Sequence, residues 1–165
     1  MVKVSFDKLD EAMSFSSDET SCWVDKTTGN VIFINSEFLD DEAFYEDEAE
    51  LQAAHEILIL CGELEMDENL EIDENRYVEV IPPNSDEKWK WMEEFTVDHV
   101  SDNYLQNKLA DALRGSKPFR RFKDTLLDFS EQREKWFEFE ARKLREFIKK
   151  WAESEHLEID FDTDK

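Results

Sequence analysis

The sequence predicts an α+β fold, with a small antiparallel sheet packed against several α-helices and a long C-terminal helix. The 165-residue chain has only three glycines and three prolines, fewer than the turns of an all-β sandwich require. One segment rich in β-branched and aromatic residues surrounds a Thr-Gly-Asn cluster, which is typical of a β-hairpin. Most of the second half carries apolar residues at helical spacing. We therefore expect a single domain over residues 1–165, with an α/β part over 1–83 and a helical part over 84–156.

The α/β part is expected to open with a short amphipathic helix. Phe6, Leu9 and Met13 recur three to four residues apart, and Ser5 before them suits an N-cap. The expected elements are, in order, a helix over 6–15, a hairpin over 21–35, a helix over 49–65 and a third strand over 76–81, which the two prolines at 82 and 83 end.

The helical part is divided by residues that start and stop helices. Ser85 is the expected N-cap of a helix that reaches about residue 99, and Ser101 or Asp102 begins the next one. Gly115 fits a C-terminal glycine cap, and Pro118 fits the first turn of a third helix.

The last long helix is expected to begin at Ser130 and to bury one apolar stripe. The residues predicted on this stripe are Trp136 or Phe137, Glu140 or Ala141, Leu144, Phe147 or Ile148, and Trp151. Residues 157–165 then form either one short strand or an acidic tail. Trp89 and Trp91 lie two apart on one helix, so one of them should be partly exposed.

The charge of the chain is extreme and uneven. The formal net charge is −23. Residues 1–100 hold 28 acidic and 6 basic side chains, whereas residues 101–165 hold 15 and 14. Such a charge disfavours binding to DNA, RNA or anionic membranes over most of the surface. It favours a non-enzymatic binding or regulatory protein that engages a basic protein partner.

The acidic segment, residues 37–74, is the first candidate for binding such a partner because it contains sixteen acidic residues and no lysine or arginine. Its carboxylates would steer the association, and one aromatic side chain, Phe44 or Tyr45, would anchor it. Two alternatives remain open: mimicry of DNA by the carboxylate array, and a solvated acidic face without a partner. The candidate partner-binding residues are Asp40, Asp41, Glu42, Phe44, Tyr45, Glu46, Asp47 and Glu48.

A basic cluster in the second half is the other candidate site. Five cations within ten residues flank the start of an expected helix, where phosphate or nucleic acid could bind. The alternative is that these cations pair with the carboxylates of the chain itself. The candidate anion-binding residues are Arg114, Lys117, Arg120, Arg121 and Lys123.

Catalytic and metal-binding patterns are weak, so we expect no metal site or cofactor, and an enzyme less than a binding protein. The three histidines are far apart, and neither cysteine has the spacing of a zinc or redox motif. The alternation from Asp67 to Asp73 resembles the start of an EF-hand loop, but Ile72 stands in place of the turn glycine and Val78 in place of the bidentate glutamate.

The sequence shows no signal peptide and no apolar run long enough for a bilayer, which predicts a cytoplasmic protein with no membrane partner. The oligomeric state is left open.

Four segments together resemble a bacterial family of small acidic proteins of unknown function. They are the hairpin DKTTGNV over 25–31, the strand YVEVIPP over 77–83, the run KPFRRFKD over 117–124 and the helix over 136–151. The chain departs from this family in its acidic segment, so the other segments carry the resemblance. The resemblance implies a cytoplasmic location and an α+β architecture, and it implies no activity, cofactor or catalytic residue.

Overall fold

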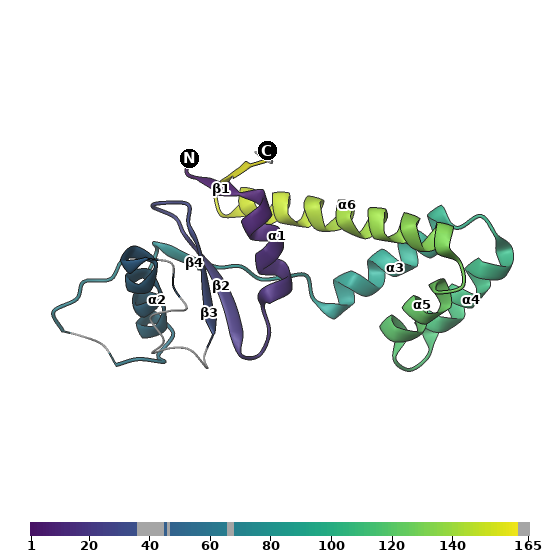
Figure 1. The fold of residues 1–165 in the computed structure, drawn as a ribbon, viewed down its shortest axis with the longest axis horizontal. Coiled ribbons are helices and arrows are strands. Elements are labelled where there is room, and N and C mark those ends of the chain that lie inside the picture. Colours follow the sequence, from purple (N-terminus) through teal and green to yellow (C-terminus); the bar gives the residue numbers. More distant parts are fainter. Residues whose placement is uncertain (36–44, 46, 66–67, 162–165) are drawn as a thin grey trace. The chain divides into compact units, whose positions relative to one another are not determined.

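The computed structural model describes residues 1–35, 45, 47–65 and 68–161. The described residues form helices, a three-stranded antiparallel sheet and a parallel strand pair, so the predicted α+β fold with a long C-terminal helix is confirmed (Figure 1). The chain divides into two compact units. The α/β unit comprises Met1–Pro82 and Ile148–Lys165, and the helical unit comprises Pro83–Phe147. Each unit is described separately below.

The sheet of the α/β unit has β2 (Thr20–Asp25) at its centre, between β3 (Val31–Asn35) and β4 (Tyr77–Glu79). Both pairings are antiparallel, and Trp23 lies opposite Ile32 on one side and Glu79 on the other. The predicted hairpin and third strand are thus present, although the third strand is shorter than predicted.

A second, parallel pair joins the two ends of the chain in the same unit. Strand β1 (Lys3–Ser5) pairs with β5 (Glu158–Asp160), so the described chain ends lie side by side (Figure 1). Val4 of β1 is fully buried. Of the two alternatives for residues 157–165, the short strand is present as β5, but β1 was not predicted because three residues are too short to show a period.

Gly29 in the hairpin turn explains how β1 approaches the sheet. Its φ angle of +82° lies in the left-handed region, and a Cβ atom there would overlap the backbone oxygen of Lys3. Glycine is the residue that meets both conditions.

Two helices accompany the sheet. Helix α1 (Phe6–Phe15) begins as predicted, with the Ser5 side chain accepting a hydrogen bond from the Lys8 N–H at 3.3 Å. Helix α2 (Glu48–Leu60) is capped by Asp47, which accepts from the Glu50 N–H at 2.8 Å. The prediction extended this second helix to residue 65, but it ends earlier. The buried residues that α2 adds to the core beside β3 are Ala53, Ala54, Ile57 and Leu58.

The helical unit contains α3 (Ser85–His99), α4 (Asn103–Arg114), α5 (Pro118–Leu126) and the first part of α6 (Ser130–Ser154). The N-cap of α3 is Asn84, whose side chain accepts from the Glu87 N–H, so the prediction of Ser85 was one residue late. Asp102 caps α4 as one of the two predicted choices.

An aromatic core holds the helical unit together. Trp136 packs edge-on against Phe95 and Phe122, with ring centroids 5.4 and 5.0 Å apart. Phe139, three residues after Trp136 and therefore on the same face of α6, is also buried, whereas Phe137 is 43% exposed. The predicted stripe omitted Phe139. Of the two alternatives that it gave next, Glu140 is half-buried and Ala141 is exposed.

The two tryptophans of α3 lie as predicted. Trp91 is buried, and Trp89 is half-buried with its indole N–H donating to the Leu113 carbonyl at 3.0 Å. Within the described part of the chain, no helix combines the length and the apolar character needed to cross a membrane.

Candidate functional site

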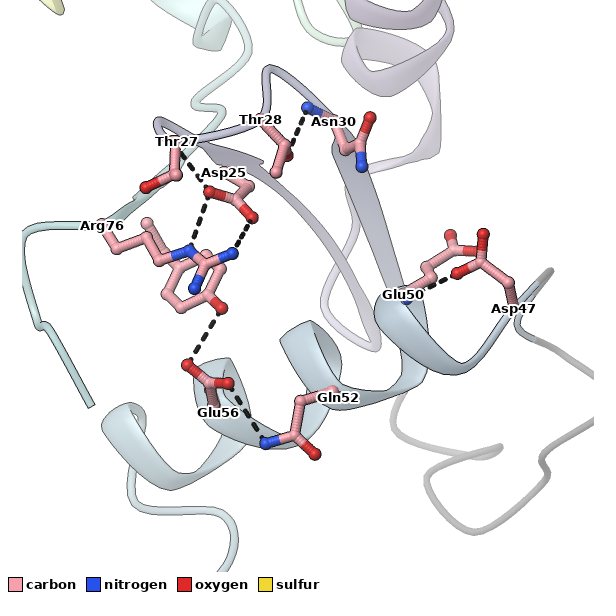
Figure 2. A network of polar contacts seen from close by, with 10 residues as sticks. Asp25, Thr27, Thr28, Asn30, Asp47, Glu50, Gln52, Glu56 and Arg76 are labelled. Atoms are coloured by element: carbon pink, nitrogen blue, oxygen red, sulfur yellow. Dashed lines mark hydrogen bonds and ion pairs between the residues drawn. The ribbon is translucent and has the colours of Figure 1, made fainter. Parts of the chain in front are cut away.

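A buried polar network fixes the hairpin of the α/β unit (Figure 2). Asp25 is 3% exposed and accepts two hydrogen bonds from Arg76, from Nε to Oδ1 at 2.9 Å and from Nη2 to Oδ2 at 2.8 Å. The Thr27 N–H donates to the same carboxylate at 2.9 Å. Burial alone would raise the pKa of Asp25, but the bonds from Arg76 and Thr27 outweigh it, so the pKa lies below its usual value.

The network continues from strand β4 to helix α2 (Figure 2). The Arg76 guanidinium lies over the Tyr77 ring at 5.3 Å, and the Tyr77 hydroxyl donates to Glu56 Oε1 at 3.1 Å. Gln52 donates to the other oxygen of Glu56 at 3.2 Å. Burial and the bond to Glu56 both raise the pKa of Tyr77, so it stays a neutral donor. These contacts tie α2 to the sheet.

The predicted partner-binding residues precede α2 in the sequence or, for Glu48, begin it. Asp40, Asp41, Glu42, Phe44 and Glu46 lie outside the described residues.

The other three predicted partner-binding residues are described. Asp47 and Glu48 are exposed at the first turn of α2. Tyr45 is 6% exposed and belongs to the core beside Ile32 and Ile57. Of the two aromatic anchors that the sequence suggested, Tyr45 thus packs in the core and Phe44 lies outside the described residues.

A shallow pocket of about 230 Å³ lies beside this turn of α2. Asp47, Glu50 and Lys8 are among its lining residues, and the Lys8 ammonium group lies 6.0 Å from the centroid of the Phe33 ring, which also lines it. This described edge of the acidic segment therefore combines carboxylates with an apolar ring.

The basic turn, defined as Arg114, Lys117, Arg120, Arg121 and Lys123, lies where α4 ends and α5 begins. All five residues are exposed. Arg114 and Arg120 form ion pairs of 3.8 Å with Asp111 and Asp124 of their own helices, and their side chains are 78% and 77% exposed. Among the described residues, these pairs are local and do not involve the acidic segment, so the cations face solvent.

The backbone of the basic turn is unusual. Lys117 has a φ angle of +49° and caps α5 without a side-chain hydrogen bond, and Pro118 follows at the first helical position. Gly115 has an extended backbone rather than the left-handed cap that its position suggested. A Cβ atom there would overlap the Arg121 guanidinium, so glycine makes room for that side chain.

The histidines and cysteines do not gather in the described structure. No group of three or more His, Cys, Asp or Glu side chains among the described residues is arranged to hold a metal ion. His99 packs on Phe139 at 4.9 Å. Burial raises the pKa of the Cys22 thiol to about 12, which leaves little of the nucleophilic thiolate at neutral pH.

The profile of a known family matches residues 2–165, nearly the whole chain. The chain belongs to the uncharacterised protein family UPF0158. A curated relative, UPF0158 protein PA5073 of Pseudomonas aeruginosa, is 27% identical over 105 residues, which cover 62% of this chain and 68% of that protein. No solved structure matches the chain. The resemblance to an uncharacterised bacterial family is therefore confirmed, and UPF0158 membership assigns no activity.

The Asp25–Arg76 pair is the feature of this UPF0158 chain that sequence reasoning missed. One signal could have found it: Arg76 is the single lysine or arginine between Lys26 and Lys88, and it opens a strand within strongly acidic sequence. Asp25 is the last residue of β2, directly after the buried Val24, and a buried carboxylate needs a cation to stay ionised.

Proposed function

We propose that this chain is a non-enzymatic binding or regulatory protein whose α/β unit engages a basic protein partner. The main support for the proposal is that the excess negative charge lies almost entirely in one of the two compact units. The α/β unit contains 29 acidic and 7 basic side chains, whereas the helical unit contains 14 and 13. One compact unit thus holds a net charge of −22 and the other a net charge of −1.

The acidic segment is the proposed contact region in the α/β unit. Asp47 and Glu48 at the exposed start of α2 are its described edge. The network from Asp25 to Gln52 holds that helix on the sheet, so these carboxylates are presented from a fixed support. An excess of one charge on a supported surface speeds association with an oppositely charged protein.

The proposed location is the cytoplasm. Cys22 and Cys61 are free thiols, as expected where disulfides are kept reduced.

Capture of partners from a bacterial lysate, followed by measurement of affinity with the purified partner, tests the proposal. We expect binding that weakens steeply with salt and is abolished by the triple variant Asp40→Lys, Asp41→Lys, Glu42→Lys. The matched control reverses three exposed acids of the helical unit, Glu93, Asp98 and Glu134, and should leave binding within about twofold. Equal loss of binding in both triple variants would show that the effect depends on net charge alone, which would contradict binding at a specific surface.

A second candidate function is anion binding by the basic turn. The exposed position of the basic turn favours this function. The five cations are not buried in internal carboxylate pairs, and α5 begins without a side-chain cap. Phosphate groups bind such helix starts when cations flank them.

Titration of the ¹⁵N-labelled protein with pyrophosphate and with a single-stranded oligonucleotide tests this second function. Shifts centred on residues 117–121 that disappear in Arg120→Ala/Arg121→Ala, but not in the control Lys108→Ala, would support it. Shifts of similar size at all surface lysines and arginines would contradict it.

A further inference from the structure

A small pocket lies on the helical unit where α5 gives way to α6. Its volume is about 100 Å³, somewhat less than the roughly 150 Å³ cavity that accommodates benzene in another protein. It shares Lys123 with the basic turn but is otherwise separate from the surfaces described above. Its lining includes Lys123, Leu126, Leu127, Arg133, Trp136 and Phe137.

The pocket combines core residues with exposed apolar residues. Leu126 and Trp136 are each 1% exposed and belong to the aromatic core. Leu127 and Phe137 are 58% and 43% exposed, so they present apolar surface to solvent at the same place. Exposed apolar side chains grouped beside a concavity mark a recognition site more strongly than scattered ones do.

Two cations flank this apolar surface. Lys123 and Arg133 are exposed, and the Arg133 guanidinium lies over the Phe137 ring at 5.1 Å. The one acidic residue that also lines the pocket, Asp124, is already paired with Arg120 at 3.8 Å. The charges therefore favour an anionic occupant, in contrast to the charge of the whole chain.

The indole N–H of Trp136 is a second unusual feature of this pocket. Its Nε1 atom is buried and has no hydrogen-bond partner among the residues that the structure describes. By contrast, the indole N–H groups of Trp23 and Trp89 donate to Ser21 Oγ and to the Leu113 carbonyl. Buried donors rarely stay unpaired, so this indole N–H should report any rearrangement of Trp136 when the pocket is occupied.

We propose that this pocket binds an acidic peptide segment of a partner protein. One apolar side chain, leucine or phenylalanine, lies partly within the pocket and packs on the exposed Leu127 and Phe137, and flanking carboxylates lie beside Lys123 and Arg133. A peptide fits better than a free small molecule because the pocket is shallow and its cations are exposed around it. A chain running across the surface can contact both cations, whereas a molecule of the pocket's size gains few contacts. The site is independent of the proposed function, which uses carboxylates of the α/β unit.

The test is a titration of the ¹⁵N-labelled full-length protein with the synthetic peptide acetyl-EDEFDED-amide, followed through the five tryptophan indole resonances. We expect the Trp136 indole signal to shift saturably while the signals of Trp23, Trp89 and Trp151 stay in place. Replacing the central phenylalanine of the peptide by alanine should weaken binding by about tenfold or more, since the apolar contact is lost.

Variants of the pocket sharpen the test. Leu127→Ser and Arg133→Glu change exposed side chains, so the fold should persist, and each should weaken peptide binding by about tenfold. The controls Val97→Ser and Lys108→Glu change an exposed apolar residue and a cation elsewhere on the helical unit and should leave the affinity unchanged.

Four outcomes would overturn the proposal. The first is no shift of the Trp136 signal at saturating peptide. The second and third are equal binding of the peptide with central alanine and equal binding of a lysine-rich peptide. The fourth is binding of free N-acetylphenylalanine as tight as that of the peptide. The last result would make the pocket a small-molecule site.

Discussion

The helical unit surrounds an aromatic core with almost balanced charges, whereas the α/β unit combines a net charge of −22 with a buried network of polar and ionised side chains. In the helical unit, apolar packing is the main source of stability, and several exposed ion pairs are local to one helix. Such pairs contribute little. In the α/β unit, a few polar contacts hold the hairpin and α2 against the mutual repulsion of many carboxylates. The two units should therefore respond differently to core substitutions, to the loss of one cation and to pH.

The largest effect is expected in the aromatic core of the helical unit. Phe139→Ala removes a 5% exposed ring that contacts Phe95 and Trp136, and it should lower the free energy of unfolding by about 3–5 kcal/mol. Phe137→Ala, on the exposed side of the same helix, should cost less than about 1 kcal/mol. Urea unfolding followed by circular dichroism measures both, and equal losses would contradict the assignment of the buried face of α6.

A comparable loss in the α/β unit should follow from the removal of one cation. Arg76→Ala leaves the Asp25 carboxylate buried without its partner, which we expect to cost about 3 kcal/mol. Arg114→Ala breaks an exposed pair and should change the free energy of unfolding by less than about 0.5 kcal/mol. Amide hydrogen exchange should place the Arg76→Ala effect in β2, β3 and β4. Unchanged protection there would show that the network does not stabilise the sheet.

Two glycines have almost the same backbone angle, so a comparison of their alanine variants distinguishes the cost of steric overlap from the cost of backbone strain. Gly29 and Gly62 have φ angles of +82° and +81°, but a Cβ atom has no neighbour within 4 Å at Gly62 and overlaps Lys3 at Gly29. Gly62→Ala should cost about 1 kcal/mol, the price of a left-handed alanine. Gly29→Ala should cost clearly more and should loosen β1. Thermal unfolding of the two variants compares them, and equal shifts in Tm would contradict the close approach of β1.

The smallest expected effect is a pH dependence confined to the α/β unit. Asp25 has a folded-state pKa below its unfolded value of 3.8, so its contribution to stability is complete above that value. The contribution is lost as pH falls through the folded-state pKa. Asp25→Asn should lower stability at pH 7 and flatten the acid limb of a plot of unfolding free energy against pH. An acid limb identical to that of the wild type would exclude Asp25 as its source.

The sequence predicted elements with a clear local signal and missed those defined by long-range contacts. A signal within a few residues predicted three of them: helix α1 with its cap Ser5, the hairpin, and the start of α6 at Ser130. Strand β1 and its partner β5 lie more than 150 positions apart, and three residues show no alternation. Phe139 was missed because apolar residues cover more than one face of α6, and the choice between Phe137 and Phe139 depends on the other helices.

The candidate surfaces show the same limit. Composition located the acidic segment and the basic turn, because charge is a property of the sequence. It could not show that Tyr45 packs in the core or that Arg114 and Arg120 pair with acids of their own helices. Nor could it show that Asp25, Arg76, Tyr77 and Glu56 meet in one network, since these residues come from three separate segments.

The most direct test of the central claim is hydrogen–deuterium exchange of the full-length protein with and without its captured partner. The account predicts that the partner protects peptides covering residues 37–50, with smaller changes over residues 85–147. Protection centred on residues 114–123, with the acidic segment unaffected, would contradict the assignment of binding to the α/β unit.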